Sequence, residues 1–293
     1  AARLRGINIF EASGALCAPA FYEPMQLISS MLDKAWYERY KRIASLNIRS
    51  SIYDVTNRCN LRCTGCFFFS SAEDQAAPEE MDIAAWEAFV EREKERGVNL
   101  AILIGGEPTL YMDRIDAFYQ RLPTYCATNG QIRVPRDRFP DMMVGISLWG
   151  DEEDEKILRG RDTFAVSSRN YAGDPYTYYL YTITPKQVGR IERMVKKIQD
   201  VGLKVHLQLL SNDEEVDGFS WNEQQLKDVR AEMDGLLDTY PETLISCKYY
   251  HQIITTGMMM GRPFGWMECP SVTEPMDDRQ PQPKRLIRFI RLA

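Results

Sequence analysis

The sequence predicts an α/β fold, a partial (β/α)6 barrel with an extension at each end. Strand-like and helix-like patterns alternate from residue 51 to residue 239, which is typical of parallel βα units. The run from 98 to 104 is almost continuously apolar, as expected of a strand that is buried on both faces. About six units can be counted, too few for a closed eight-stranded barrel, so we expect an open one.

The individual elements follow from hydrophobic periodicity and from helix-end signals. Asp82 and Thr184 stand where helix N-caps are expected, and Pro185 suits the first position of the second of these helices. Strands are expected over 51–55, 98–104, 124–128, 144–148, 177–183 and 203–210. Helices are expected over about 27–43, 82–96, 113–122, 185–200 and 221–239.

The domain organisation predicted from these patterns has three parts. Residues 1–48 form an N-terminal extension with one helix, 49–240 form the barrel, and 241–293 form a C-terminal extension. The abrupt end after a basic, apolar stretch is compatible with a longer natural chain.

Composition narrows the class of protein. The 293 residues carry a formal net charge of −6, which argues against a nucleic-acid partner. No apolar run approaches the length of about 20 residues that a membrane-spanning helix needs, and no signal peptide is visible, so we expect a cytoplasmic protein with no membrane partner. Seven cysteines without secretory signals do not indicate a disulfide framework; clustered cysteines in a reducing compartment more often bind metal.

Three cysteines follow the first predicted strand with the spacing C-x3-C-x2-C: Cys59, Cys63 and Cys66. Thiolates are the usual ligands of iron–sulfur clusters, and three of them leave one iron of a cubane cluster open to a small molecule. The alternative is a structural zinc site, which requires four protein ligands. His206 is far away in sequence, and no second C-x2-C motif follows.

This cysteine loop, placed directly after the first strand, resembles that of the radical S-adenosylmethionine (SAM) superfamily. The resemblance implies a partial barrel of the radical SAM type with two cofactors, a [4Fe–4S] cluster and SAM. It further implies that SAM chelates the open iron and is cleaved by one electron to methionine and a 5′-deoxyadenosyl radical, which abstracts a hydrogen atom from the substrate.

A second motif, Gly105-Gly106-Glu107-Pro108, ends the second predicted strand and resembles the GGE motif of that superfamily. The resemblance implies that these residues receive the methionyl amino group of SAM. Glycines allow a close approach of the backbone to a ligand, and a carboxylate favours an ammonium group. Taken alone, such residues are also common in ordinary turns.

Weaker candidates follow the third and fourth strands. Thr128 and Asn129 resemble a Thr-Asn-Gly signature of the superfamily, although an Asn-Gly turn explains them nearly as well. Ser147 closes the fourth strand, where the resemblance implies a contact with the ribose or carboxylate of SAM. Either Arg159 or Arg161 could bind the SAM carboxylate as a fork, or the two could belong to a solvated basic turn.

The expected function is therefore enzymatic: hydrogen-atom abstraction from a polar small molecule or a peptide, with an electron donor such as flavodoxin or ferredoxin. Two alternatives remain open, a group transferase (methyl or aminocarboxypropyl) with the same cofactors and a non-catalytic iron–sulfur scaffold. Cys126 lies inside the third strand and is expected to be a small buried hydrophobe. Cys247 and Cys269 are too few for an auxiliary cluster and are expected to be free.

Overall fold

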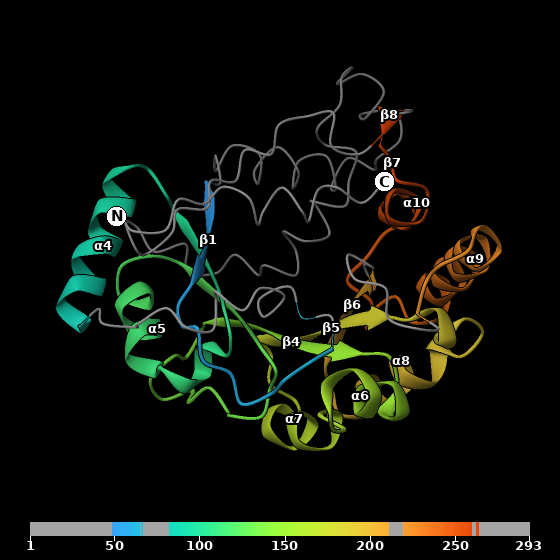
Figure 1. Cartoon of the computed structure of the whole chain (residues 1–293), viewed down its shortest axis with the longest axis horizontal. Coiled ribbons are helices and arrows are strands. Elements are labelled where there is room, and N and C mark those ends of the chain that lie inside the picture. Colours follow the sequence, from blue (N-terminus) through green and yellow to red (C-terminus); the bar gives the residue numbers. More distant parts are fainter. Residues whose placement is uncertain (1–48, 65, 67–81, 211–218, 260–261, 264–293) are drawn as a thin grey trace.

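The computed structural model of the chain describes residues 49–64, 66, 82–210, 219–259 and 262–263 (Figure 1). Their centre is a sheet of six parallel strands that neighbour one another in chain order. The strands are β1 (Ser50–Asp54), β2 (Leu100–Ile104), β3 (Thr124–Thr128), β4 (Met143–Trp149), β5 (Thr177–Ile183) and β6 (Lys204–Leu209). Within the described residues β1 and β6 form the two edges and do not pair with each other, so the predicted open (β/α)6 architecture is confirmed.

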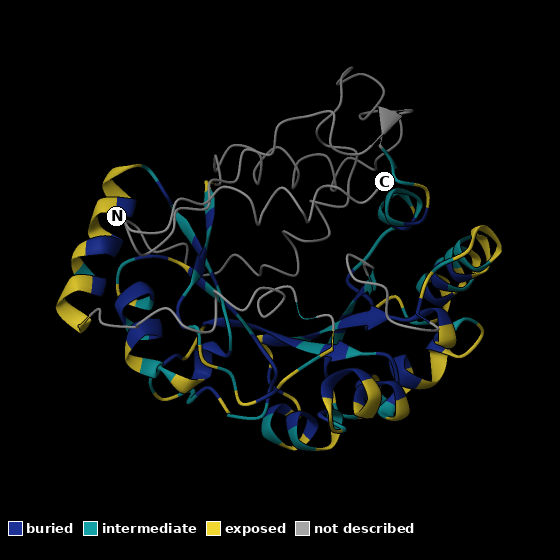
Figure 2. Cartoon of the chain, in the orientation of Figure 1, coloured by how far each residue is buried: buried dark blue, intermediate teal, exposed yellow. Residues whose placement is uncertain are grey.

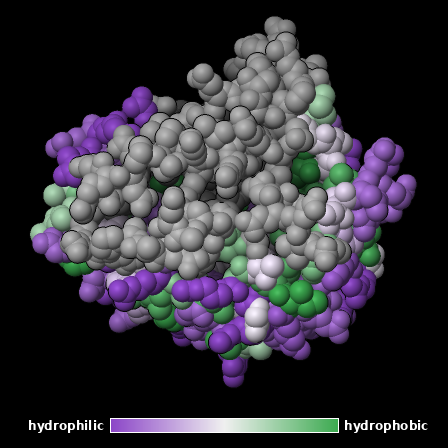
Figure 3. Space-filling view, in the orientation of Figure 1, coloured by the Kyte–Doolittle hydropathy of each residue, from purple (hydrophilic) through white to green (hydrophobic). Residues whose placement is uncertain are grey.

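Helices cover the outer, convex side of this sheet (Figure 1). They are α4 (Ile83–Glu95), α5 (Met112–Tyr119), α6 (Glu152–Arg159), α7 (Phe164–Tyr171), α8 (Ile191–Asp200) and α9 (Glu223–Thr239). The face of each helix toward the sheet is buried and the opposite face is exposed (Figure 2), and hydrophilic side chains cover α4 and α9 at the two sides of the view in Figure 3.

The core lies between sheet and helices because alternate residues of each strand point to opposite faces. Tyr53, Leu103, Ile146 and Val205 are fully buried on the helix side. Ser147 lies between two buried neighbours and is itself only half-buried, so it belongs to the inner face. The position of a polar residue along its strand therefore decides whether its side chain lies on the inner face of the sheet, as Ser147 does, or in the core.

Several predicted boundaries agree with the structure, others shift by two or three residues, as for β2 and α5, and one helix starts in the wrong place. Asp82 caps α4 by accepting a hydrogen bond from the Ala85 N–H at 2.7 Å. The predicted helix over 185–200 is wrong, because a short 3₁₀ helix, η4 (Pro185–Gln187), is followed by a break and then by α8.

The cause of that break is a set of side-chain partners far away in the sequence. Thr184 does not cap a helix; its hydroxyl donates to the Asp154 carboxylate at 2.6 Å. Gly189 adopts a φ of 79°, and the Glu232 carboxylate accepts from the N–H groups of Gly189 (2.6 Å) and Ile191 (2.7 Å). A carboxylate from α9 thereby stabilises the start of α8.

Three helices were not predicted: α6, α7 and α10 (Lys248–Thr256). The sequence signal for α6 exists, because Asp151 accepts from the N–H groups of Glu153 and Asp154, and Gly160 ends the helix with a φ of 76°. Before α10, the chain bonds to Val205 at the β6 edge: the Val205 N–H donates to the Thr243 carbonyl (2.9 Å), and the Ile245 N–H donates to the Val205 carbonyl (2.8 Å). Two short antiparallel strands, β7 (Met258–Met259) and β8 (Arg262–Pro263), follow α10.

The predicted helix over 27–43, Gly65 of the cysteine loop and Cys269 lie outside the described residues. In the described part of the chain, no helix is both long enough and apolar enough to cross a membrane.

Candidate functional site

The cysteine loop starts where β1 ends, at the carboxyl end of the sheet. Cys59, Cys63 and Cys66 are half-buried and free of disulfides. The Cys66 N–H donates to the Cys63 carbonyl at 3.3 Å, and the Thr64 N–H donates to the Leu158 carbonyl at 2.6 Å. The second bond attaches the loop to the last turn of α6.

The thiols lie in an environment that disfavours their negative charge. The pKa of Cys59 is raised to about 11, chiefly by burial and also by the nearby Glu107, Cys63 and Cys66, while a hydrogen bond from the Leu61 N–H opposes the shift. Burial also raises the pKa of Cys63, whereas Arg159 opposes that shift. Thiolates in this loop therefore need a positively charged partner such as a metal centre.

The three sulfurs do not converge as the ligands of one metal ion. Among the described residues, no group of three His, Cys, Asp or Glu side chains is placed to hold a single ion. A cubane cluster differs from zinc in this respect, because each of its thiolates binds a different iron atom. The loop accordingly offers three separated thiols rather than one compact tetrahedral site.

The Gly105-Gly106-Glu107-Pro108 turn packs directly against the start of the cysteine loop. The Gly106 N–H donates to the Thr56 carbonyl, and the Glu107 N–H donates to the Arg58 carbonyl, both at 2.8 Å. A Cβ on Gly105 would lie 2.7 Å from the Thr56 oxygen, and one on Gly106 would lie 2.2 Å from the Arg58 oxygen. The backbone that these glycines approach is thus the chain's own, whereas the sequence alone had suggested a ligand.

Glu107 is the buried centre of the site, with only 1% of its surface exposed. Its Oε1 accepts from the Thr109 N–H (3.1 Å), the Thr109 hydroxyl (2.5 Å) and the Thr128 hydroxyl (2.6 Å). Among the described residues, its Oε2 accepts one bond, from the Asn129 N–H at 2.8 Å. No described residue forms an ion pair with it, so a buried carboxylate stands without a cation in this part of the chain.

Thr128 and Asn129 connect this carboxylate to the cysteine loop. The Asn129 side-chain amide donates to the Asn60 side-chain oxygen at 2.6 Å, and Asn60 follows Cys59 directly. Gly130 adopts a φ of 73°, and a Cβ there would lie 2.6 Å from Ser167. Asn129 and Gly130 thus form a turn, and Asn129 also belongs to the polar network around Glu107.

Arg159, the last residue of α6, is buried beside the loop with 4% of its surface exposed. Its Nη1 donates to Glu155 at 2.9 Å, to the Thr163 hydroxyl at 3.3 Å and to the Ser147 carbonyl. The alternative of a solvated basic turn is wrong for Arg159, although Arg161 is exposed.

The remaining predicted residues occupy distinct positions. Pro108 starts a short 3₁₀ helix, η3 (Pro108–Leu110), and Ser147 lies on the inner face in register with Leu180 and His206. Cys126 is fully buried in the core, as predicted. Asn60, Thr56 and Thr109 were missed, because their roles arise from contacts between segments and leave no local spacing signal.

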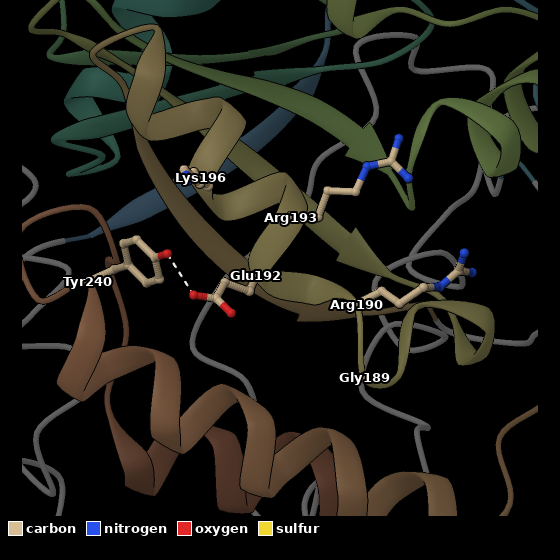
Figure 4. Close-up of a pocket in the computed structure, with 6 residues that line it drawn as sticks. All are labelled: Gly189, Arg190, Glu192, Arg193, Lys196 and Tyr240. Carbon is tan, nitrogen blue, oxygen red and sulfur yellow. Dashed lines mark hydrogen bonds between the residues drawn. The ribbon is translucent and has the colours of Figure 1, made fainter.

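A surface hollow of about 490 Å³ lies elsewhere, between the start of α8 and Tyr240 (Figure 4). It is lined by the basic residues Arg190, Arg193 and Lys196. Arg193 is paired with Glu152 at 2.9 Å, so the basic charge is partly neutralised. The hollow is formed on the helix side of the sheet, away from the cysteine loop.

A second polar group outside the site has the composition of a catalytic triad. His251 in α10 lies 2.8 Å from Asp234 in α9 through Nδ1 and 2.6 Å from the Ser246 hydroxyl through Nε2. His251 has no exposed surface, so we interpret the group as a connection between the two helices.

Comparison with known proteins gives a consistent family. The model of the Radical SAM superfamily matches residues 53–264. Streptococcus suis SuiB bound to S-adenosylmethionine is similar in structure, with a TM-score of 0.53 and 17% identity over 75% of this chain and 58% of that one. SuiB bound to the precursor peptide SuiA gives a TM-score of 0.54 and 15% identity, with coverages of 72% and 53%.

Native anSMEcpe with bound AdoMet has a TM-score of 0.53 and 18% identity, and the match covers 72% of this chain and 67% of that one. These likenesses show a shared fold, and the chain spans little more than half the length of SuiB. No curated protein sequence matches significantly. Members of the matched superfamily are enzymes whose cofactors are a [4Fe–4S] cluster and SAM. Because the family model covers well over half of its length, this chain belongs to the radical SAM superfamily.

Proposed function

We propose that the chain binds a [4Fe–4S] cluster through Cys59, Cys63 and Cys66 and binds SAM beside the Glu107 turn. When bound, these cofactors supply a one-electron reductive cleavage of SAM to methionine and a 5′-deoxyadenosyl radical, which abstracts a hydrogen atom from the substrate. The substrate class that we propose is a polar small molecule or a peptide. Flavodoxin or ferredoxin is the type of electron donor that suits this reaction, and a cytoplasmic location agrees with it.

The observation that carries the proposal is the polar network that joins three strand ends into one unit. The loop after β1, the turn after β2 and the end of β3 are connected through Asn60, Glu107 and Asn129. Parallel βα folds place their chemistry at this carboxyl edge. A buried network of this kind holds the three segments in one arrangement.

The residues present fit the two cofactors. The free thiols of the loop form the donor set of a cluster that keeps one iron open. Glu107 is a buried carboxylate without a cation among the described residues, and its Oε2 accepts only one hydrogen bond. The ammonium of SAM is a cation of the appropriate size for this oxygen, because charge-assisted bonds to carboxylates are strong.

The inner face of the sheet supports a polar substrate. Thr182 and Gln208 are hydrogen-bonded to each other at 2.7 Å, and Ser147 and His206 lie on the same face. A face of this composition offers donors and acceptors to a peptide or a hydroxyl-rich molecule. The neighbour SuiB was solved with a precursor peptide, which favours a peptide substrate.

The first experiment is reductive SAM cleavage by anaerobically reconstituted protein, measured as chromatographic release of 5′-deoxyadenosine with dithionite as reductant. We expect Cys59→Ala, Cys63→Ala and Cys66→Ala each to abolish release, because losing one thiolate opens a second iron. Cys126→Ala is the matched control, and we expect near wild-type release from it, since this thiol is buried in the core. Release that survives in any loop variant would contradict the proposed ligands.

The second experiment measures SAM affinity by titration calorimetry on the cluster-loaded protein. Glu107→Gln keeps the shape of the side chain and removes its charge, so we expect SAM binding to weaken by about 1.5–3 kcal/mol. The exposed Glu153→Gln on α6 is the control and should leave the affinity unchanged. An unchanged affinity in Glu107→Gln would show that Glu107 serves the turn alone.

Product analysis separates the alternatives. Incubation with SAM, reductant and a cell extract should yield 5′-deoxyadenosine together with a modified metabolite or peptide. Transfer of a methyl or aminocarboxypropyl group from SAM to the product would identify a transferase, and a cluster-loaded protein that cleaves no SAM would identify a scaffold.

A further inference from the structure

The outer surface of α6 is joined to the cysteine loop by a backbone hydrogen bond. The Thr64 N–H donates to the Leu158 carbonyl at 2.6 Å, and Thr64 directly follows Cys63, one of the proposed cluster ligands. Leu158 is buried, whereas Lys156 and Ile157 in the same turn of the helix are exposed. A protein that docked on this side of α6 would therefore lie next to the loop that is proposed to hold the cluster.

A large apolar side chain reaches the surface at this place. Ile157 is 55% exposed, and no other large hydrophobic side chain among the described residues is more exposed. Figure 3 shows hydrophobic surface over α6, bordered by hydrophilic side chains. A single exposed isoleucine is ordinary on a protein surface, but small interfaces combine an apolar centre with a polar rim, so the charges around Ile157 decide what it can bind.

The acidic residues of α6 contribute little charge to this surface. The helix begins with four of them in succession. Asp154 and Glu155 are buried, and Glu152 is paired with Arg193 of α8 at 2.9 Å. Glu153 is therefore the one acidic residue of α6 that is exposed and forms no ion pair with the described residues.

The basic residues around Ile157 are exposed. Lys156 precedes it in the helix, and Arg161 follows the C-cap of the helix; neither forms an ion pair with a described residue. In the cysteine loop, the exposed Arg62 donates to two main-chain carbonyls at 3.1 and 3.0 Å. Arg62, Lys156, Ile157 and Arg161 are called the α6 patch below. Its basic charge contrasts with the net charge of −6 of the whole chain.

We infer that the α6 patch is the docking surface for an acidic one-electron carrier protein of the flavodoxin kind, which delivers electrons to the cluster beside it. This inference rests on the proposed function, because it requires the cluster to be bound by the cysteine loop. The carrier gives up one electron to the bound cluster and is itself oxidised by one step, and no covalent bond changes. A small patch with one apolar residue and several basic ones suits such a partner, because electron-transfer interfaces are small and complementary charges speed their formation.

The first measurement is binding, and it does not depend on catalysis. A fluorescently labelled acidic flavodoxin is titrated with the reconstituted full chain, and anisotropy gives the Kd. In Lys156→Glu we expect the Kd to rise about tenfold, because a negative charge then faces an acidic partner. In Glu153→Lys we expect it to fall about threefold, since the exposed acid of the same helix is replaced by a base. Ile157→Ser should weaken binding without changing its salt dependence, and the wild-type affinity should fall between about 0.05 M and about 0.5 M salt.

The matched control is Lys196→Glu. Lys196 is an exposed lysine of α8 in the basic hollow, on the helix side of the sheet and away from the cysteine loop. Its reversal changes the net charge of the chain by the same amount as Lys156→Glu, so any effect of overall charge is equal in the two variants. We expect the control to bind flavodoxin as the wild type does.

The second measurement compares two sources of electrons for SAM cleavage. With reduced flavodoxin below saturation, we expect Lys156→Glu to release 5′-deoxyadenosine about tenfold more slowly than the wild type. With dithionite, which needs no docking surface, the same sample should release it at the wild-type rate. An equal loss with both reductants would show that the variant damages the enzyme and would count against docking at α6.

The remaining outcomes also decide. Unchanged Kd values in Lys156→Glu and Glu153→Lys would overturn the inference and leave Lys156 as a residue that stabilises the end of its helix. Equal weakening in Lys156→Glu and Lys196→Glu would reduce the effect to overall charge, and weakening in Lys196→Glu alone would assign the carrier to the basic hollow. If Lys156→Glu does not fold, Glu153→Lys and Ile157→Ser decide, because their shifts must have opposite signs. A wild-type protein that releases no 5′-deoxyadenosine with dithionite would refute the proposed function itself, whatever it binds.

Discussion

The two ends of the sheet each contain an arginine, Arg136 half-buried and Arg159 buried, and the two differ in how completely their donors are satisfied. At the amino end, Arg136 bonds to Asp174 (2.7 Å), to Thr177 (3.0 Å) and to two main-chain carbonyls. At the carboxyl end, Arg159 bonds to Glu155 (2.9 Å) through Nη1 and keeps an Nε–H that no described residue accepts. An ion whose donors are all satisfied within the protein stabilises the fold, whereas a buried ion with an unsatisfied donor indicates a place where a ligand can bind.

The buried carboxylates show the same contrast. Asp174 has a cation beside it, while Glu107 has four neutral donors and no ion pair with the described residues. Buried charge without a countercharge is expensive, and proteins retain it where a ligand provides the missing partner. If this is correct, residues at the amino end of the sheet serve stability, and residues at the carboxyl end serve ligand binding as well.

The largest effect on stability is expected from Glu107→Ala. The change leaves buried donors of Thr109, Thr128 and Asn129 unsatisfied, and each costs about 1–3 kcal/mol. We expect the free energy of unfolding, measured by denaturant titration, to fall by about 4 kcal/mol or more. Glu153→Ala on the exposed face of α6 should change it by less than about 0.5 kcal/mol. A loss below about 1 kcal/mol in Glu107→Ala would show that the network is weak.

The second-largest loss of stability is expected from Arg136→Met. The substitution leaves the Asp174 carboxylate, which is 8% exposed, without its cation and removes two bonds to carbonyls. Breaking a buried pair in this way costs about 3 kcal/mol. The same titration measures the loss, and 5′-deoxyadenosine release from the folded protein should remain at the wild-type level. Impaired release would break the proposed division between the two ends.

Gly106→Ala tests the contact between the two motifs. The added Cβ would lie 2.2 Å from the Arg58 carbonyl oxygen, and backbone cannot move aside as a side chain can. We expect destabilisation by about 2–3 kcal/mol and poorer cluster loading, measured as iron content after reconstitution. Gly235→Ala in α9 is the control, since its Cβ meets nothing within 4 Å, and it should stabilise the helix by up to about 1 kcal/mol. Equal behaviour of the two variants would contradict the tight contact at Gly106.

The smallest effect concerns pH and His251. Burial lowers the pKa of His251, although Asp234 opposes the shift, with Arg230 and Lys248 nearby. A folded-state pKa below the unfolded value of about 6.5 means that stability is complete above that pH and falls as the pH drops below it. We expect the free energy of unfolding to decrease between pH 7 and 5 with a slope of at most about 1.4 kcal/mol per pH unit for this proton.

The control for that prediction is His251→Gln, which should reduce the slope. Some dependence should remain, because burial also lowers the pKa of His206. A wild-type stability that rises on acidification over this range would contradict the direction of both shifts.

Much of the fold could be predicted from the chain itself. The strands β3 and β5 have the predicted bounds, and Asp82 caps its helix, because periodicity and capping are local properties of a few neighbouring residues. The helix predicted from Pro185 failed because Thr184 bonds to Asp154 and Glu232 caps α8, and neither partner is local.

The cysteine spacing and the Gly-Gly-Glu-Pro turn were sufficient to predict the family, because the spacing of ligands within one loop is a property of consecutive residues. Only the tertiary structure decided which residues contact these two motifs. It placed Asn60 against Asn129, turned Gly106 toward the backbone of Arg58, and buried Arg159 against Glu155 instead of leaving it in a solvated turn. These contacts join residues from different βα units, and their energies depend on burial and on partners that parallel strand ends bring together.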